Sequence, residues 1–535
     1  MGCGGGESPS LEAALASITA EDLARHIQVL SADSMEGRAP ASPGEEKAVT
    51  YLKNRFEGLG LRPGNGNSYF QEVPLVSLTA DPGMTLTVAE GDEARAYEYG
   101  SQFMAWTKQV VDRVELNDSE LVFVGYGVVA PEYGWNDYEG LDVRGKTVVI
   151  LVNDPGFATG DPELFNGRSM TYYGRWTYKY EEAARQGAAA AIVVHETEPA
   201  GYPWEVVSGS WSGPQFDLVA ADANLSRVKV EGWVTLETAR ELFERAGLSY
   251  EALKASAATR EFRAVPMGLT ASLRVVNEVR RSTSRNVLAV LPGRDRPDEY
   301  VVYMGHWDHL GRDPSLEGDQ IYNGALDNAS GSAALLELAQ AFTTLERAPR
   351  RSILFLVTTA EEQGLLGSKY YASNPVYPLA RTVAAINIDG IDIWGPMRDI
   401  TVVGFGMSEL DDYLEAAAGT QNRVLRPDPE PEKGFYYRSD HFEFAKRGVP
   451  ALYTDAGIDH VEGGEEYGRR MRDEYTAERY HKPSDEYDAS WDLSGGVEDL
   501  RLLFRVGYRA ADGSAYPNWR EGTEFRAIRD SMLAN

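Results

Sequence analysis

Apolar residues at helical spacing indicate that the first part of the chain forms helices. One stripe follows the spacing i, i+4, i+8 and i+11, and its members are Ala48, Leu52, Phe56 and Leu59. These positions share one face of a helix, and Gly60 follows as a residue that commonly ends helices. The spacing predicts helices across Leu11–Leu61, interrupted by a turn-rich loop over Leu30–Pro40.

The middle of the chain, from about Leu121, has short runs of β-branched residues between loops rich in Gly, Pro and aromatic residues. The runs are Leu121–Val124, Thr147–Val152 and Ala189–Val194, with a helix near Tyr180–Gln186. This stretch carries almost none of the residues that form the candidate site described below. It therefore predicts an inserted β-rich domain over residues 111–265.

From Asn286 onward, near-continuous apolar runs alternate with helical patterns. The runs are Val287–Leu291, Tyr300–Met304, Ile353–Thr359, Val383–Ile388 and Ala451–Thr454. Between the second and third runs, apolar residues have helical spacing: Leu335, Leu338, Phe342 and Leu345. This alternation predicts an α/β domain with a mixed, mostly parallel central sheet flanked by helices. We expect a tether over residues 1–19, the first part of this domain over 20–110 and its main part over 266–535.

Length and charge narrow the class of protein. A chain of 535 residues exceeds what one hydrophobic core normally supports, which predicts two or three domains. The 82 acidic and 52 basic residues give a net charge of −30, which argues against a nucleic-acid partner because phosphate neutralisation needs basic surface. No apolar run approaches the roughly 18 residues that a membrane-spanning helix needs.

The single cysteine, Cys3, excludes a disulfide framework and a cysteine-based zinc site. It follows Gly2 and precedes a stretch rich in Gly, Ser and Pro, which looks like the mature end of a bacterial lipoprotein. This interpretation predicts membrane attachment through a lipidated Cys3 and an extracytoplasmic location, periplasmic, outer-envelope or secreted. The alternative is a cytoplasmic protein with a flexible start.

Acidic residues and histidines cluster where the predicted strands end. One strand runs into Gly305-His306-Trp307-Asp308-His309, the next into Ala360-Glu361-Glu362, and a third into Asp389-Gly390. A loop with Asp327, rich in Gly, Asn and Ser, lies just before the helix between the first two strands. Because ligands bind at the carboxyl ends of strands in open α/β sheets, these segments predict one site.

The residue types in this predicted site suit a pair of metal ions. Histidine nitrogen and carboxylate oxygen are good zinc ligands, and Asp327 is the candidate to bridge two cations. His306 and Asp308 are two residues apart at a strand end, so we expect the Asp308 carboxylate to accept the spare imidazole N–H. Glu361 and Glu362 should point in opposite senses, so that one binds metal and the other acts as general base towards a water molecule.

Five ordered motifs resemble those of the co-catalytic di-zinc exopeptidases, which include secreted bacterial leucyl aminopeptidases and glutamate carboxypeptidases. The motifs are His-x-Asp-His, Asn-Gly-x-x-Asp-Asn-x-Ser-Gly, Glu-Glu, Asn-x-Asp-Gly and a late His before Pro-Ser-Asp. The resemblance covers about residues 20–80 and 275–500. It implies two Zn²⁺, with Co²⁺ or Mn²⁺ as substitutes. One metal would bind His306 and Asp389, the other Glu362 and His481, with Asp327 between them.

The same resemblance implies the remaining roles. Glu361 would be the general base, Asp308 the support for His306, and Tyr480 a group that stabilises the oxyanion. The inserted domain is similar to the protease-associated domain found in part of this family.

Other residues near these motifs have more ordinary interpretations. His309 is expected to pack or hydrogen-bond beside the site rather than bind metal. His441 either lines the substrate pocket or is structural. The aromatic segment Tyr172–Trp176 is expected to pack in the core or on the surface, with contact to substrate as the alternative.

The predicted function is hydrolysis of peptides from one end, with an aminopeptidase favoured over a carboxypeptidase or dipeptidase. Spare carboxylates such as Glu361 and Asp389 would recognise an α-amine, whereas Arg438 is the candidate to recognise an α-carboxylate. A glutaminyl cyclase and a non-catalytic receptor-like module share the resembled fold. The cyclases bind one zinc, and receptor-like relatives have lost ligands, whereas the complete set is present in this chain.

Overall fold

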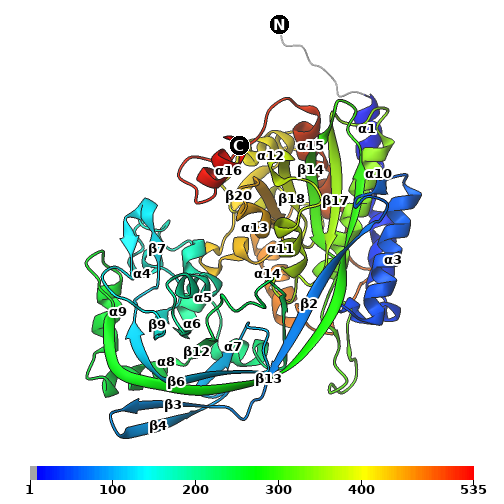
Figure 1. Cartoon of the computed structure of the whole chain (residues 1–535). Helices are drawn as coiled ribbons and strands as arrows, with labels where there is room; N and C mark the ends of the chain where they lie inside the picture. Colours follow the sequence, from blue (N-terminus) through cyan, green and yellow to red (C-terminus); the bar gives the residue numbers. More distant parts are fainter. Residues whose placement is uncertain (1–8, 535) are drawn as a thin grey trace. The chain divides into compact units, whose positions relative to one another are not determined.

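The computed structural model describes residues 9–534, and these form two compact units (Figure 1). The first unit contains the chain up to Val73, Thr283–Asp428 and the chain from Arg438. The second unit contains Pro74–Ser282 and Pro429–Tyr437. The chain therefore leaves the first unit and returns to it, as expected of an inserted domain.

The first unit is built on a mixed sheet whose central strands are parallel. The strands are β1 (Arg62–Pro63), β13 (Val265–Leu291), β14 (Arg296–His306), β17 (Arg351–Thr358), β18 (Thr382–Asn387), β19 (Asp399–Val403), β20 (Val424–Pro427) and β21 (Ala451–Asp455). Pairing gives the order β1-β13-β17-β14-β18-β21-β19-β20. The four neighbours β17, β14, β18 and β21 run parallel. β17 and β18 are buried throughout, and β14 is buried from Tyr300 onward. The predicted α/β fold with a mostly parallel sheet is confirmed.

Helices cover both faces of this sheet (Figure 1). One layer contains α2 (Ala20–Leu30), α3 (Pro43–Gly58), α10 (Gly331–Thr344), α12 (Leu410–Gly419) and α15 (Ser494–Asp512). The other contains α11 (Leu366–Ser373) and α13 (His441–Ala445). In α3 the predicted apolar stripe faces the core, where Phe56 stacks on Phe355 of β17 with ring centroids 5.8 Å apart. Ser42 caps this helix by accepting hydrogen bonds from the backbone N–H groups of Gly44 and Glu45.

The second unit has its own hydrophobic cores and its own short helices. Parallel strands β6 (Arg113–Phe123), β9 (Thr147–Leu151), β10 (Ala190–Val194) and β12 (Val230–Val234) lie side by side. Its longer helices are α5 (Trp176–Arg185), α8 (Leu236–Arg245) and α9 (Tyr250–Ala257). The last two were not expected of a β-rich domain, and Leu242 and Phe243 of α8 are buried.

The second unit begins earlier than the residue expected for the insert, at Pro74 rather than near 111. The reason is strand pairing. β2 (Phe70–Ala80) pairs with β11 (Pro214–Leu218), β3 (Thr85–Glu90) with β13, and β5 (Phe103–Trp106) with β12. These hydrogen bonds assign most of residues 74–110 to the second unit.

Part of the segment expected to be a tether is a helix, α1 (Pro9–Ala16), in which Ala14 and Leu15 are buried. Arg501 donates to the carbonyl oxygens of Leu15 and Ile18, which fixes this helix to the first unit. Cys3, the residue expected to be lipidated, lies outside the described residues. Over residues 9–534, every helix is too short or too polar to cross a lipid bilayer.

Candidate metal centre

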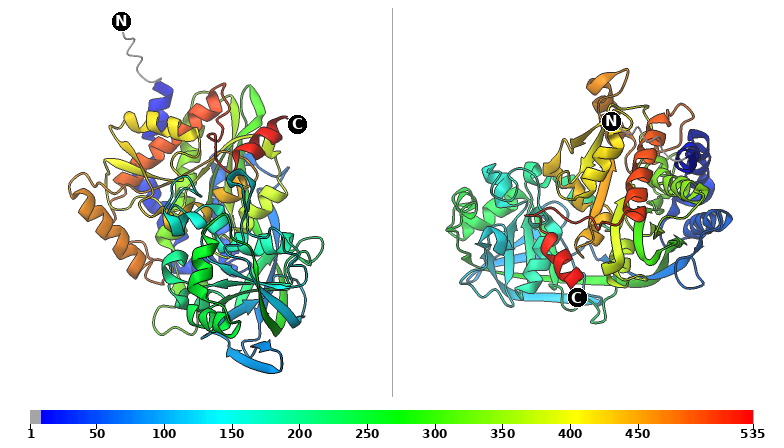
Figure 2. Two further views of the ribbon diagram at one scale, coloured as in Figure 1. Left: turned by 90° about the vertical axis from the view of Figure 1, so that its left-hand side faces the viewer. Right: turned by 90° about the horizontal axis from the view of Figure 1, so that it is seen from above.

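The predicted site residues meet at the carboxyl-terminal edge of the parallel strands. His306 ends β14, Glu361 and Glu362 follow β17, and Asp389 follows β18. Asp327 lies in the turn before α10, and His481 follows α14 (Gly464–Glu478), a largely exposed helix at the margin of the first unit (Figure 2). The six residues come from five separate stretches of the chain, and all of them belong to the first unit.

Asp327 lies between the two histidines. Its Oδ1 is 3.4 Å from His306 Nε2, and its Oδ2 is 3.1 Å from His481 Nε2. On one side, His306 Nε2 is 3.0 Å from Asp389 Oδ1. On the other side, His481 Nε2 is 3.0 Å from Glu362 Oε2. One carboxylate thus faces two matching histidine–carboxylate pairs.

These spacings fit a pair of metal ions. Two ligand atoms that each lie about 2.0 Å from a tetrahedral zinc are about 3.3 Å apart, and the four distances above fall close to that value. His306, Asp327 and Asp389 offer donor atoms that all lie within 4.8 Å of one another. His309, Asp327 and Glu362 form a second such group, so Asp327 belongs to both. The donor set of imidazole nitrogen and carboxylate oxygen is the one that zinc prefers when thiolates are absent.

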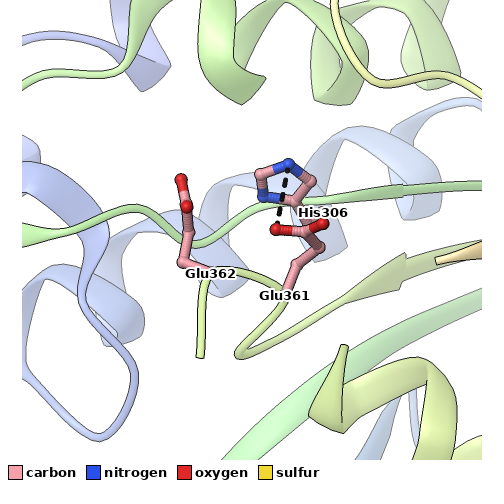
Figure 3. Close-up of side chains that lie close together, drawn as sticks. All are labelled: His306, Glu361 and Glu362. Atoms are coloured by element: carbon pink, nitrogen blue, oxygen red, sulfur yellow. Dashed lines mark ion pairs between the residues drawn. The ribbon is translucent and has the colours of Figure 1, made fainter. Parts of the chain in front are cut away.

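Glu361 and Glu362 have opposite environments although they are adjacent (Figure 3). Glu361 lies beside His306, with Oε2 3.9 Å from Nε2, and burial raises its pKa well above the usual range. Burial also acts on Glu362, but His481 and His309 outweigh it and lower the pKa of that carboxyl to about 2. Glu361 can therefore take up a proton, while Glu362 stays ionised as a ligand.

Asp308 does not hold His306 in the way we expected. His306 Nδ1 is 3.1 Å from the backbone carbonyl oxygen of Asp308 and 3.9 Å from its carboxylate. The strand ends at His306, so the alternation that would align the two side chains stops there. The Asp308 carboxylate instead accepts the backbone N–H of Glu361 at 3.1 Å. Asp308 thus positions the Glu361–Glu362 segment, and burial raises its own pKa to about 8.

The carboxylates of Glu362 and Asp389 are each oriented by one hydrogen bond to a side chain outside the candidate ligand set. His309 Nδ1 lies 2.6 Å from Glu362 Oε1, so His309 hydrogen-bonds beside the site as expected. Ser439 donates its hydroxyl to Asp389 Oδ2 at 2.6 Å, and Asn387 Nδ2 donates to Ser439 Oγ at 2.7 Å. Each bond occupies one carboxylate oxygen and leaves the other for a cation. The sequence analysis gave no role to Ser439, and it included Asn387 only as the first residue of the Asn-x-Asp-Gly motif.

Tyr480 and His481 are adjacent residues at one side of the candidate site. The Tyr480 ring stacks on the His481 imidazole, with centroids 3.9 Å apart, and 46% of the Tyr480 surface is exposed. His481 adopts a left-handed backbone with φ 56°, which is unfavourable for a residue with a side chain and is typical of functional sites. The phenol is therefore available as a donor next to the candidate ligands.

The other residues singled out from the sequence lie around or away from this cluster. His441 is fully buried in α13, and its ring lies against Tyr453 at 4.9 Å. Arg438 is partly buried three residues earlier. Tyr172 and Tyr173 pack on Tyr178 within the second unit, at 5.6 and 5.0 Å between ring centroids.

The fold and the paired ligands define a class of protein, in which an α/β sheet holds cations at its carboxyl-terminal edge. Residues 286–504 match the family model described as Peptidase family M28. This part of the chain contains all six candidate ligands, and it is the part that is similar to peptidase family M28.

Two known proteins are similar in sequence to shorter stretches of this chain. The aminopeptidase NAALADL1 of Mus musculus is 38% identical over 129 residues, which are 23% of this chain and 16% of the relative. The leupeptin-inactivating enzyme 1 of Streptomyces exfoliatus is 30% identical over 181 residues, 34% of this chain and 37% of the relative. The matches thus span well under half of the length of these relatives.

Among solved structures, an aminopeptidase from Aneurinibacillus sp. strain AM-1 is similar over 95% of this chain and 97% of its own. The TM-score is 0.53 and the sequence identity 23%, a likeness that concerns the fold.

Proposed function

We propose that the chain is a metal-dependent exopeptidase that binds two Zn²⁺ and removes residues from the amino end of peptides. The observation that carries this proposal is the Asp327 carboxylate, which faces His306 and Asp389 on one side and His481 and Glu362 on the other. Co²⁺ or Mn²⁺ would substitute in the same donor set.

Bound zinc ions would polarise the scissile carbonyl and lower the pKa of a water molecule. Glu361 lies beside His306 with a raised pKa, so it suits the proton transfers. The water oxygen forms a bond to the carbonyl carbon while Glu361 accepts the proton. The same proton passes from Glu361 to the leaving nitrogen as the C–N bond breaks. The Tyr480 phenol would donate a hydrogen bond to the developing oxyanion.

The charge of the site favours a free α-amine over a free α-carboxylate. Seven carboxyl groups lie in or directly against it: Asp308, Asp327, Glu361, Glu362, Asp389, Asp440 and Asp485. Two dications and the buried guanidinium of Arg38 leave no surplus positive charge there. An α-ammonium is attracted to such a site, whereas an α-carboxylate needs a cationic partner such as Arg438. The name of one relative, the aminopeptidase NAALADL1, agrees with this direction.

We further propose that the second unit is a protease-associated-like domain and that the protein acts outside the cytoplasm on peptide substrates. The feature that motivates a lipid on Cys3 is the Gly2-Cys3 pair followed by a stretch rich in Gly, Ser and Pro. Mass spectrometry of the protein from its native membrane would detect the added lipid on the N-terminal peptide.

The test of the activity is mass spectrometry of a mixed peptide library after incubation with the zinc-loaded protein. Glu361→Gln and a chelator-treated sample serve as controls. We expect stepwise loss from the amino end, absent in both controls. Loss of residues from the carboxyl end would support peptide hydrolysis but would show that the protein is a carboxypeptidase rather than an aminopeptidase. Absence of cleavage by protein with two bound metals would reject the proposed activity.

A further inference from the structure

The loop that carries Asp327 is held by a fully buried arginine from the N-terminal part of the chain. Arg38 is 1% exposed and lies in the loop before α3. Its guanidinium donates to the carbonyl oxygens of Asn323 at 2.6 Å and Gly324 at 2.8 Å. It also donates to Trp307 at 2.8 Å and Leu30 at 2.7 Å, so it ties the loop to the end of β14 next to His306.

The same loop is held from the C-terminal part of the chain by a buried aspartate. Asp485 is completely buried, and its two carboxylate oxygens accept the backbone N–H groups of Leu326 and Asp327, each at 3.1 Å. Its backbone carbonyl accepts the N–H of Ala325 at 3.0 Å. The hydroxyl of Tyr475 donates to the carboxylate at 3.2 Å.

Together the two residues bind backbone groups of five consecutive residues, Asn323 to Asp327. Arg38 occupies the carbonyl groups of residues 323 and 324, and Asp485 occupies the N–H groups of residues 325–327. Asp485 also follows His481 by four residues, so one short turn carries a candidate ligand and the group that fixes Asp327. Asp327 thereby gains its backbone position from both ends of the chain.

Burying the charges of Arg38 and Asp485 costs free energy, which other interactions must offset. A charge removed from water loses several kcal/mol, and such pairs are often no more stable than apolar replacements. Three of the four hydrogen bonds of Arg38, and all three backbone N–H groups bound by Asp485, involve segments that carry candidate metal ligands or their immediate neighbours. The fourth bond of Arg38 goes to Leu30. The positions of Arg38 and Asp485 are therefore better explained by the need to fix the backbone around Asp327 than by a contribution to the free energy of unfolding.

We propose that Arg38 and Asp485 are positioning residues that hold Asp327 where its two oxygens can serve two cations at once. The proposal rests on the proposed function only in assuming two bound metals. It requires no particular substrate.

The direct variants are Asp485→Asn and Arg38→Lys. The asparagine keeps the shape but turns an N–H₂ group towards one of the backbone N–H groups that the carboxylate accepts. The lysine keeps the charge but cannot reach four carbonyl groups at once. We expect each variant to weaken binding of zinc about 10- to 100-fold, as outer-sphere changes typically do.

Matched controls are present in the same unit. Asp399 is completely buried, accepts the N–H groups of Ile458 and Asp459 at 2.9 Å, and pairs with Arg426. Arg351 is completely buried and donates to the carbonyl groups of Ala510 and Ala515. Asp399→Asn and Arg351→Lys therefore cause a similar loss of buried hydrogen bonds away from the site. They should lower stability without changing zinc affinity.

The experiment measures zinc affinity by competition with a chromogenic chelator, and unfolding of the metal-free protein in urea, for all four variants. In Co²⁺-loaded samples, electron paramagnetic resonance reports the spin coupling that a shared carboxylate supports. The proposal predicts weaker affinity and lost coupling in the site variants alone. Equal losses in the controls, or wild-type affinity and coupling in folded Asp485→Asn, would overturn it. If Asp485→Asn does not fold, Arg38→Lys decides by the same criteria. A coupled metal pair in a protein without peptidase activity would reject the proposed function and leave this inference standing.

Discussion

At the scale of single residues, the site separates two adjacent glutamates into different roles. Glu361 is buried and has one histidine, His306, beside it. Glu362 is flanked by two histidines, His309 and His481. Chain position alone does not create this difference. Burial raises the pKa of the Glu361 carboxyl, whereas His481 and His309 outweigh burial at Glu362 and lower the pKa of that carboxyl.

Replacement of Glu361 by glutamine should abolish turnover without removing metal. We expect kcat to fall at least about 100-fold, the range found when a general base is removed, with two zinc ions retained. In the wild type, the base works when ionised, so kcat/KM should rise with pH through a pKa above the usual value of about 4.3. Glu361→Asp should keep this acid limb. Pre-steady-state and pH-rate measurements would reveal it, and wild-type turnover by Glu361→Gln would contradict the assignment.

Asp327 is predicted to be the residue on which both metals depend. Asp327→Ala removes the carboxylate that faces both histidines, so the variant should lose at least one zinc ion. Elemental analysis after dialysis measures this directly. Asp298→Ala, whose side chain is 70% exposed, is the control and should keep the full metal content. Two equivalents of zinc in Asp327→Ala would show that another group bridges.

At the scale of elements, parallel pairing explains why distant residues meet. His306 of β14 is opposite Thr358 of β17, and Met304 is opposite Asn387 of β18. The residues that follow these strands, including Glu361 and Asp389, therefore emerge at one edge. Helix α10 packs beneath this edge and carries a buried carboxyl group, Glu337, among apolar neighbours.

Glu337 should make the stability of the fold depend on pH. Its Oε2 accepts the Thr19 N–H at 3.1 Å, Nε2 of His26 is 3.9 Å from its Oε1, and burial raises its pKa to about 7. Because the folded-state pKa is raised, its contribution is complete below about pH 4.5 and is lost as the pH rises through 7. Glu337→Gln mimics the neutral form. Its free energy of unfolding relative to wild type should grow by about 1–3 kcal/mol between pH 5 and pH 8.

Urea denaturation at several pH values would measure this difference. Exposed Glu57→Gln is the control and should show no such trend. Burial lowers the pKa of the neighbouring His26 to about 4, so this imidazole is neutral in the folded wild type throughout the measured range. A pH-independent difference for Glu337→Gln would mean that Glu337 stays ionised in the folded protein.

At the scale of the whole molecule, the chemistry belongs to one unit only. The first unit contains every candidate ligand, and the second has separate cores. The ligands span His306 to His481, and the groups that position them extend to Arg38. Folding of the first unit therefore brings the candidate ligands together.

Zinc should stabilise the two units unequally. Ligand binding to the folded state adds about 2.7 kcal/mol when its free concentration is one hundred times the dissociation constant. Hydrogen exchange with and without zinc should therefore show added protection in β14 and β18, and little change in β9 and β10. Asp327→Ala should lose the effect. Equal protection of both units would show that metal binding couples them.

The sequence alone determined the periodic elements and the order of the chemical motifs. The apolar stripe of α3 and the buried runs of β14, β17 and β18 are local patterns. The acidic and His residues at the ends of these strands predicted a metal site from the sequence alone. Such patterns survive in one dimension because helices and strands repeat over a few residues.

Only the tertiary structure decided which groups hold the ligands. Arg38 and Asn323 are 285 residues apart, and Ser439 lies 50 residues from Asp389. The Asp308 carboxylate turned to the Glu361 backbone rather than to His306, and pairing of β2, β3 and β5 moved the start of the second unit. These contacts join segments that share no local period, so their partners are chosen by packing and by the need to satisfy buried polar groups.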